Sequence, residues 1–154
     1  MNSIPYIISI LIAQCAGGIG AFFTTNSVGT WYTTLSKPLW NPPSWLFGPV
    51  WILLYTLMGI AAALVYQHKG SKQTTRALSL YTVQLALNAL WSILFFGMKN
   101  PGGSFVEIII LLGFIIVTTI LFWRVNTWAG ILMLPYIAWV SFATYLNYTI
   151  WQLN

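Results

Sequence analysis

Long apolar stretches separated by short polar connections run along the whole chain. A helix that crosses the hydrocarbon core of a bilayer needs about 20 mainly apolar residues. Five stretches meet this requirement, and all but the fourth lack charged residues. They cover residues 4–23, 44–66, 77–98, 104–123 and 128–151. The pattern therefore predicts a single domain, residues 1–154, that is an all-α integral membrane protein built as a bundle of five transmembrane helices.

One connection differs from the others. Residues 24–43 carry Trp31, Tyr32, Trp40 and three prolines, whereas the other connections are short and hold charges or helix breakers. Long loops in compact domains are usually functional lids or disordered linkers, and a disordered linker would be polar. Two interpretations stay open: the aromatic residues line the membrane interface, or the segment forms a structured cap over the mouth of the bundle.

The composition supports the membrane class. Hydrophobic residues make up 58% of the chain and charged residues only 5%, whereas a soluble domain carries about 25% charged residues. A disulfide framework is excluded because the chain has one cysteine. The lack of a Lys/Arg run argues against a nucleic-acid partner. The expected surroundings of this protein are therefore a lipid bilayer.

The small number of ionisable side chains also excludes most enzyme mechanisms. Glu107 is the one acid and His68 the one histidine, so a carboxylate pair, a Ser-His-Asp set and a His/Cys metal cluster are all excluded. We therefore expect no metal site and no required cofactor. Glu107 lies about one turn inside the fourth span, where we expect it to reach water or Lys99 at the interface.

The basic residues predict a topology. An odd number of spans places the termini on opposite sides of the membrane. Four of the six Lys and Arg residues fall on the N-terminal side, and Lys37 and Lys99 fall on the other. The positive-inside rule then predicts a multi-pass protein of the cell membrane with a cytoplasmic N-terminus.

Three of the spans carry a stripe that mixes aromatic and polar side chains, since residues three or four apart share a helix face. The stripes are Phe47, Trp51, Tyr55 and Met58; Gln84, Asn88, Trp91 and Phe95; and Tyr136, Trp139, Ala143 and Asn147. Polar groups at membrane depth face protein or a cavity. Any one stripe is explained by helix packing, because amides often only join helices. Three similar stripes instead predict an aromatic cavity for a flat, largely apolar ligand.

The first span carries small residues rather than a polar stripe. Ala13 and Gly17, Ala16 and Gly20, and Gly17 and Ala21 are each four residues apart. Such pairs permit close approach of a second helix. The spacing leaves open whether that helix belongs to the same chain or to a second copy.

Four motifs extend over most of the chain. They are WYTTLSKPLWNPP at residues 31–43, FGPVW at 47–51, QLALNALW at 84–91 and PYIAWVSFATYLNYTIW at 135–151. In these motifs the sequence resembles the translocator protein family, also called tryptophan-rich sensory proteins. The resemblance implies a five-helix fold, commonly a homodimer, that binds protoporphyrin IX or a related tetrapyrrole. It places the ligand pocket among the first loop and the second, third and fifth helices.

The resemblance also names residues. When the ligand-binding positions of the family are matched to this sequence through the shared motifs, they fall on Tyr32, Trp51, Asn88, Trp91, Trp139 and Ala143. The helix stripes add Phe47 and Tyr55 to the predicted ligand-binding residues. The family's sterol motif needs a basic residue after its tyrosine, and none follows Tyr148 here, so we do not expect sterol binding.

Some bacterial members of the family promote light-dependent breakdown of protoporphyrin IX. That chemistry is attributed to tryptophans that match Trp51 and Trp139, which are the candidate catalytic residues here. An indole can exchange an electron with an excited porphyrin without any acid–base pair. The leading hypothesis is a porphyrin-binding and sensing protein with possible photochemical turnover, and the alternative is a transporter of porphyrin or another apolar solute.

Overall fold

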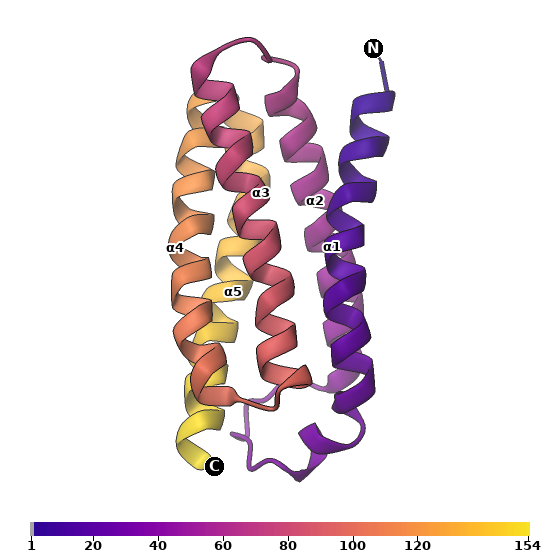
Figure 1. Cartoon of the computed structure of the whole chain (residues 1–154), viewed down its shortest axis with the longest axis vertical. Coiled ribbons are helices and arrows are strands. Elements are labelled where there is room, and N and C mark those ends of the chain that lie inside the picture. The colour runs from indigo at the N-terminus through magenta and orange to yellow at the C-terminus, as the bar shows by residue number, and fades with distance from the viewer. Residues whose placement is uncertain (1) are drawn as a thin grey trace.

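Five long helices make up the computed structural model, which describes residues 2–154 (Figure 1). They are α1 (Ile4–Val28), α2 (Phe47–Tyr66), α3 (Lys72–Ser92), α4 (Pro101–Val125) and α5 (Thr127–Leu153). Three short helical turns join them: η1 (Trp31–Thr34), η2 (Ser44–Leu46) and η3 (Ile93–Gly97). Each long helix is apolar and long enough to cross a membrane. The predicted all-α bundle of five transmembrane helices is therefore confirmed.

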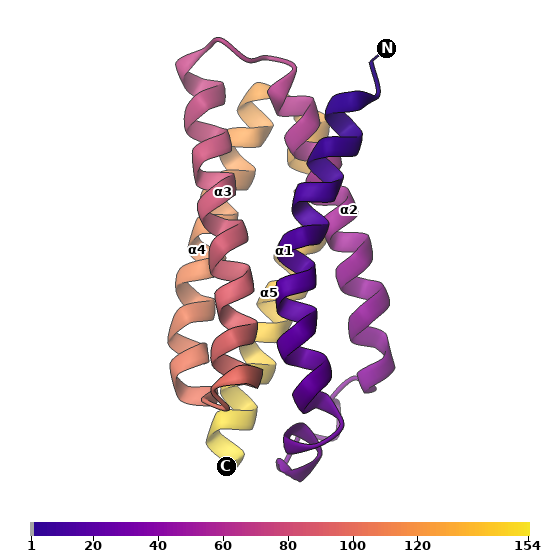
Figure 2. The ribbon, with the colours of Figure 1, turned by 45° about the vertical axis from the view of Figure 1, so that its right-hand side comes forward.

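All five helices run along the long axis of the molecule, and the two termini lie at opposite ends (Figure 1). We call the end that holds Ile4 the N end, and the end that holds residues 29–43 and the C-terminus the cap end. Helix α4 packs against α3 and α5, and α1 packs mainly against α2. Figure 2 shows that α1 and α2 lie close together towards the N end and diverge towards the cap end.

The helices extend beyond the predicted spans at several ends. Helix α1 continues past residue 23 to Val28, so the loop predicted for residues 24–43 starts five residues later. Thr24 and Thr25 do not break the helix, because their hydroxyls donate to the carbonyls of Gly20 and Ala21 over 2.9 Å each. A threonine hydroxyl bonded in this way is satisfied inside a helix.

Helix caps explain two further differences from the predicted spans. Helix α3 starts at Lys72 rather than at residue 77, and the Ser71 hydroxyl accepts the Thr74 N–H at 3.1 Å. Helix α4 starts at Pro101 rather than at residue 104, and the Asn100 side chain accepts the Gly103 N–H at 2.9 Å. Hydropathy measures only the apolar part of a helix, so it misses polar turns that extend beyond the bilayer core.

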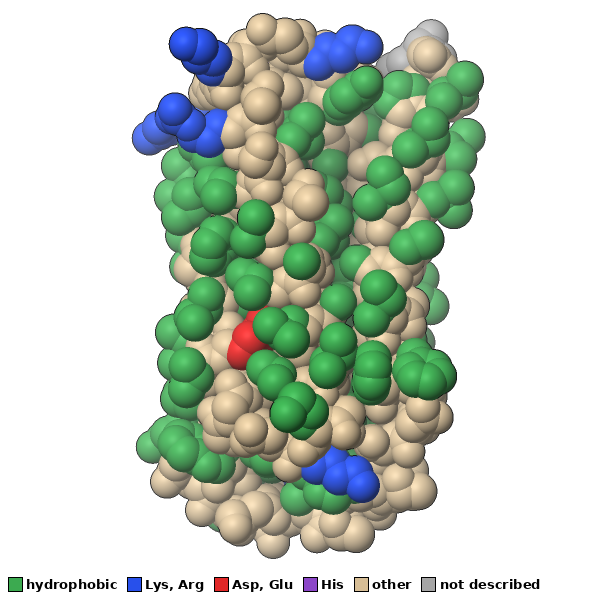
Figure 3. All heavy atoms as spheres, viewed as in Figure 1, with side chains coloured by type: hydrophobic (Ala, Val, Ile, Leu, Met, Phe, Trp, Pro, Cys, Tyr) green, Lys and Arg blue, Asp and Glu red, His purple; other side chains and the backbone are tan. Residues whose placement is uncertain are grey.

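The surface matches a membrane location. Apolar side chains cover the flank of the bundle, and Lys and Arg side chains lie near its two ends (Figure 3). Ile7, Leu11 and Phe22 of α1 are each more than half exposed. Such a surface is stable in lipid and not in water. Together with the five apolar helices, it identifies a multi-pass integral membrane protein.

Glu107 does not reach the interface, contrary to the sequence expectation. Its side chain is 6% exposed, and neither carboxyl oxygen has a hydrogen-bond partner within residues 2–154. Lys99 is exposed in the turn before α4, where it adopts a positive φ of 54°. The prediction was wrong because helix α4 turns Glu107 into the bundle, and spacing along one helix does not determine its rotation.

Candidate functional site

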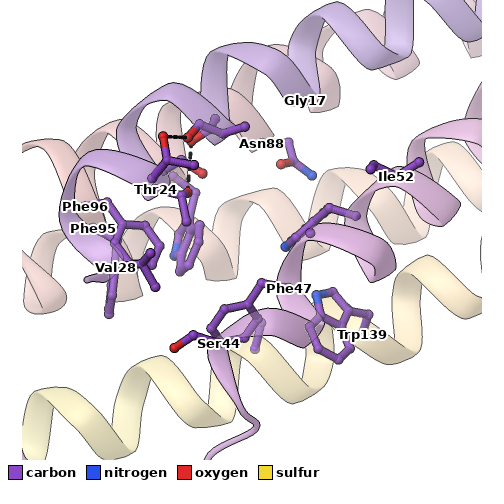
Figure 4. A pocket seen from close by; sticks show the side chains of 18 of the residues that line it. Gly17, Thr24, Val28, Ser44, Phe47, Ile52, Asn88, Phe95, Phe96 and Trp139 are labelled. Carbon is purple, nitrogen blue, oxygen red and sulfur yellow. Dashed lines mark hydrogen bonds between the residues drawn. The ribbon is translucent and has the colours of Figure 1, made fainter. Parts of the chain in front are cut away.

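A cavity of about 490 Å³ lies in the cap-end half of the bundle. Helices α1, α2, α3 and α5 contribute to its wall together with η3, and the close view in Figure 4 shows Phe47 and Trp139 next to each other, with Asn88 on the other side. Ligand pockets for drug-sized molecules have volumes of about 300–1,000 Å³. The cavity is therefore large enough for an organic ligand.

All the residues predicted to bind a ligand line this one cavity. They are Tyr32, Phe47, Trp51, Tyr55, Asn88, Trp91, Trp139 and Ala143. They come from η1 and from helices α2, α3 and α5. The structure thus brings together residues as far apart in the sequence as Tyr32 and Ala143. Their role as ligand contacts stays a prediction.

The cap segment, residues 29–43, is fixed over the cap end of this cavity by hydrogen bonds around Tyr32. The Tyr32 hydroxyl donates to Asn41 Oδ1 at 2.8 Å. Lys37 Nζ donates to the carbonyls of Tyr32 and Leu35 at 2.7 and 3.0 Å, and it lies 4.8 Å from the centre of the Tyr32 ring. Burial raises the pKa of the Tyr32 phenol to about 12, although the bond to Asn41 lowers it. Tyr32 therefore contributes a neutral ring and hydroxyl to the cavity at neutral pH.

The aromatic residues of the cap segment lie on two different sides of it. Tyr32 is 3% exposed and lines the cavity, whereas Trp40 is 43% exposed at the outer surface. The Trp40 ring stacks on Tyr145 with ring centres 5.2 Å apart. The segment thus forms a structured cap over the bundle, and a position of Trp40 at the membrane interface stays a prediction.

Asn88 belongs to a buried chain of hydrogen bonds. The Tyr55 hydroxyl donates to Asn88 Oδ1 at 2.7 Å, and Asn88 Nδ2 donates to the Tyr136 hydroxyl. The Tyr136 hydroxyl in turn donates to Gln84 Oε1 at 2.7 Å. These bonds join α2, α3 and α5. The amide predicted to contact a ligand is thus engaged with protein partners, and its main effect is to hold the cavity wall in place.

Trp91 is also held by a hydrogen bond. Its indole N–H donates to Asn147 Oδ1 at 2.9 Å, and Ser104 Oγ donates to the same oxygen at 3.0 Å. Asn147 Nδ2 donates to the Pro101 carbonyl at 2.8 Å. The Trp91 ring stacks on Phe95 with ring centres 5.1 Å apart. Trp91 is therefore a rigid part of the wall.

Trp51 and Trp139 are held differently from Trp91. Within residues 2–154, neither indole N–H makes a hydrogen bond. Trp51 packs against Tyr55 with ring centres 5.6 Å apart, and Trp139 packs against Phe142 at the same distance. Both indoles line the cavity, and ring packing holds them in position. Because neither N–H is bonded to protein, each is available for a ligand.

One wall of the cavity was missed by the sequence analysis. Helix α1 contributes residues from Gln14 to Val28, including Gly17, Gly18 and Ala21. The small residues of this helix predicted only a contact with another helix. Gly17 does make such a contact, since a Cβ added there would lie 2.7 Å from the Tyr55 ring. Gly18 does not, since a Cβ there would meet no atom within 4 Å.

The cavity is electrically neutral. Among the described residues, 2–154, its lining includes no Lys, Arg, Asp, Glu or His. The same residues contain no group of three or more His, Cys, Asp and Glu side chains that could hold a metal ion. The lining can stack on a flat ligand and offer a few hydroxyl, amide and indole hydrogen bonds, but it does not neutralise a charge.

Comparisons with known proteins agree with this architecture. A sequence model of the TspO/MBR family matches residues 9–152. The tryptophan-rich protein TspO of Archaeoglobus fulgidus is 43% identical over 154 residues, which cover 100% of this chain and 99% of that protein. The tryptophan-rich sensory protein of Cereibacter sphaeroides is 44% identical over 138 residues, covering 88% of this chain and 85% of that protein. The human translocator protein is 39% identical over 138 residues, covering 88% of this chain and 82% of that protein.

Proposed function

The chain belongs to the TspO/MBR family, and from this premise we propose that it binds protoporphyrin IX or a related tetrapyrrole in the cap-end cavity as a membrane-embedded sensor. The observation that carries the proposal is the lining itself, in which Tyr32, Trp51, Trp91 and Trp139 surround one uncharged space. Aromatic side chains favour offset stacking or edge-to-face contact with another π-system. A flat macrocycle fits such a wall.

The neutral lining also constrains the pose of the ligand. Burying a carboxylate without a partner costs several kcal/mol or more. The macrocycle therefore occupies the space between the aromatic rings, and any carboxylate side chains of the ligand lie at the edge of the cavity. Ser44 supplies a hydroxyl group at that edge.

We further propose that Trp51 and Trp139 promote light-dependent breakdown of the bound tetrapyrrole. In the first step, one indole gives one electron to the photoexcited macrocycle, which leaves an indole cation radical and a tetrapyrrole anion radical. Both indoles line the cavity and lack a hydrogen bond to protein. Trp91, whose N–H is bonded to Asn147, is assigned to the wall instead.

The test is a porphyrin fluorescence titration followed by illumination, with wild type, Trp51→Phe and Trp139→Phe compared. Because phenylalanine keeps an aromatic ring but is much harder to oxidise, we expect binding within about tenfold of wild type and much slower loss of porphyrin absorbance. Trp123→Phe is the matched control, since Trp123 is 41% exposed on α4 and outside the cavity lining. Equal bleaching in all four proteins would exclude the two indoles as electron donors, and absence of saturable binding would exclude the porphyrin site.

Transport is the second candidate, favoured by the name of the human relative, a translocator protein. A carrier needs access to its site from both sides of the membrane. The cavity reaches only as far towards the N end as Gln14, Tyr55 and Asn88. Porphyrin uptake into sealed proteoliposomes separates the two functions, since a sensor binds without accumulating porphyrin inside the vesicle.

Three expectations about the setting accompany this proposal. The family resemblance supports a homodimer, which light scattering of the purified protein with correction for bound detergent would detect. The greater number of basic residues at the N end supports a cytoplasmic N-terminus in the cell membrane. Fusion of a compartment-sensitive reporter to either terminus would test the orientation.

A further inference from the structure

The exposed part of the cavity lining lies on one side of the bundle. Within residues 2–154, every exposed lining residue belongs to α1 or to the segment formed by η2 and α2. On α1 these residues are Gly18, Ala21 and Thr25. On η2 and α2 they are Ser44, Trp45, Gly48 and Ile52. The lining residues of α3, η3 and α5 are all buried or half-buried, so the cavity opens between α1 and α2.

The same two helices are closed towards the N end. A Cβ added at Gly59 would lie 2.5 Å from Ile10 Cα, which shows that the two backbones touch there. One helical turn nearer the cap end, Gln14 Nε2 donates to the Ile52 carbonyl and to Thr56 Oγ1 at 3.0 Å each. From these contacts towards the cap end, α1 and α2 diverge (Figure 2). The opening therefore begins near the middle of α1 and widens towards the cap end.

The cap itself offers no comparable opening. Tyr32 is the one cap residue in the cavity lining, and it is 3% exposed. The backbone of Ser36 is joined to the Asn154 side chain by two hydrogen bonds, one from the Ser36 N–H at 3.0 Å and one to the Ser36 carbonyl at 2.9 Å. A ligand arriving from water at this end would have to displace these contacts.

We propose that the cavity exchanges its ligand sideways with the bilayer, through a window between α1 and α2 whose edges are Gly18 and Ala21 on one side and Gly48 and Ile52 on the other. Ile52 is 61% exposed and faces lipid in a membrane-spanning helix. The window edge carries no charge. It therefore admits a flat amphiphilic molecule already dissolved in the bilayer and gives no attraction to an ion in water.

The glycines at the window allow it to be blocked without disturbing the fold. A Cβ added at Gly18 or Gly48 would meet no atom within 4 Å. Leucine at either position is therefore accommodated and fills part of the window. Gly113→Leu is the matched control, because Gly113 is also open to a Cβ and lies on α4, away from the cavity.

The first test needs no porphyrin. A spin label is attached to Ala143→Cys inside the cavity, in a Cys15→Ser background and in lipid vesicles. We expect oxygen, which concentrates in the bilayer, to relax the label more than a water-soluble nickel chelate does. Gly18→Leu and Gly48→Leu reduce the oxygen effect, and Gly113→Leu leaves it unchanged. A label that is relaxed mainly by the nickel chelate would overturn the proposal, as would an oxygen effect that is the same in all four backgrounds.

The second test measures exchange rates, and it rests on the proposed porphyrin function. Protoporphyrin IX is transferred from donor vesicles to protein in acceptor vesicles, and its fluorescence is followed in time. Gly18→Leu and Gly48→Leu slow both association and release by about tenfold, with a smaller change in Kd. Asn154→Ala, which frees the cap, leaves both rates unchanged.

The outcomes separate the two proposals. Faster exchange in Asn154→Ala with unchanged rates in the glycine variants would show entry through the cap and overturn the window. If wild type binds no porphyrin while the spin-label pattern holds, the porphyrin function fails and the window stands.

Discussion

The N-end and cap-end halves of the bundle are built from side chains of different size. In the N-end half the buried positions between helices are mainly small, as at Ala61, Ala62, Ala77 and Ala129, each less than 5% exposed. The cap-end half holds a cluster of packed aromatic rings, in which Trp91, Phe95 and Phe96 lie with ring centres 4.8–6.0 Å apart. The cavity of about 490 Å³ lies only in this second half.

This difference shows how one bundle separates stability from binding. Helices in a bilayer gain no hydrophobic energy from association, so close van der Waals contact between small residues holds them together. In the cap-end half, the helices surround a cavity that is lined in part by larger aromatic side chains. The N-end half therefore supplies the stability that allows the cap-end half to keep an open site.

The largest expected effect comes from opening the close-packed half. Gly59→Leu places a side chain against the Ile10 backbone, which cannot move as a flexible side chain would. We expect a loss of about 3 kcal/mol in the free energy of unfolding, because overpacking of a tight contact costs this much. Thermal unfolding in detergent measures it, with Gly113→Leu as the control of equal size. Equal melting temperatures for the two variants would contradict the assignment of stability to this half.

A smaller loss is expected where the two halves meet. Asn88→Ala removes the bonds from Tyr55 and to Tyr136. Such bonds between membrane helices contribute about 1–2 kcal/mol at most, so we expect a destabilisation of that size together with weaker porphyrin binding. Gln67→Ala is the control, since its single bond to Tyr6 lies at an exposed position of the N end. A loss no greater than in this control would show that the buried chain does not join the helices.

Filling the cavity is expected to affect binding rather than stability. Ala143→Leu extends into the empty space, so the free energy of unfolding changes by less than about 1 kcal/mol. Porphyrin affinity falls by about tenfold because the added side chain takes ligand volume. Ala138→Leu controls for the added leucine, since Ala138 is exposed on the same helix and outside the lining. Unchanged affinity in Ala143→Leu would place the ligand elsewhere.

The smallest expected effect is at the cap. Asn154→Ala removes two hydrogen bonds to Ser36 that are exposed to water, and because water bonds to the freed backbone groups, the net loss in the free energy of unfolding is small. We expect no measurable change in the melting temperature and faster amide hydrogen exchange confined to residues 29–43. Exchange that also accelerates in α1 or α2 would show that the cap stabilises the bundle and not only the mouth of the cavity.

Much of the site was predictable because a helix face is a local property. Phe47, Trp51 and Tyr55 share one face of α2 wherever that helix is placed, and all three line the cavity. The rotation of a whole helix about its axis is not a local property, so the sequence did not predict which way every side chain points. Glu107 turned inward rather than towards the interface. Asn88 bonds to Tyr55 and Tyr136, and its contact with a ligand stays a prediction.

Helix α1 illustrates the remaining limit. Its small residues predicted close helix packing, and Gly17 does pack against Tyr55. Gly18, the next residue, faces the opening of the cavity instead. Adjacent residues of a helix point about 100° apart, and the rotation of α1 about its axis decides which of the two glycines meets Tyr55.

The sequence by itself determined that this is a five-helix membrane protein with aromatic faces on three helices, because hydropathy and helical period depend only on residues near one another in the chain. The three faces together predicted a cavity, and tertiary structure alone decided that α1 supplies one of its walls and that it opens between α1 and α2. The contact of Gly59 with Ile10 brings two distant backbones together at the N end. The divergence of the same helices beyond that contact leaves the window open towards the cap end.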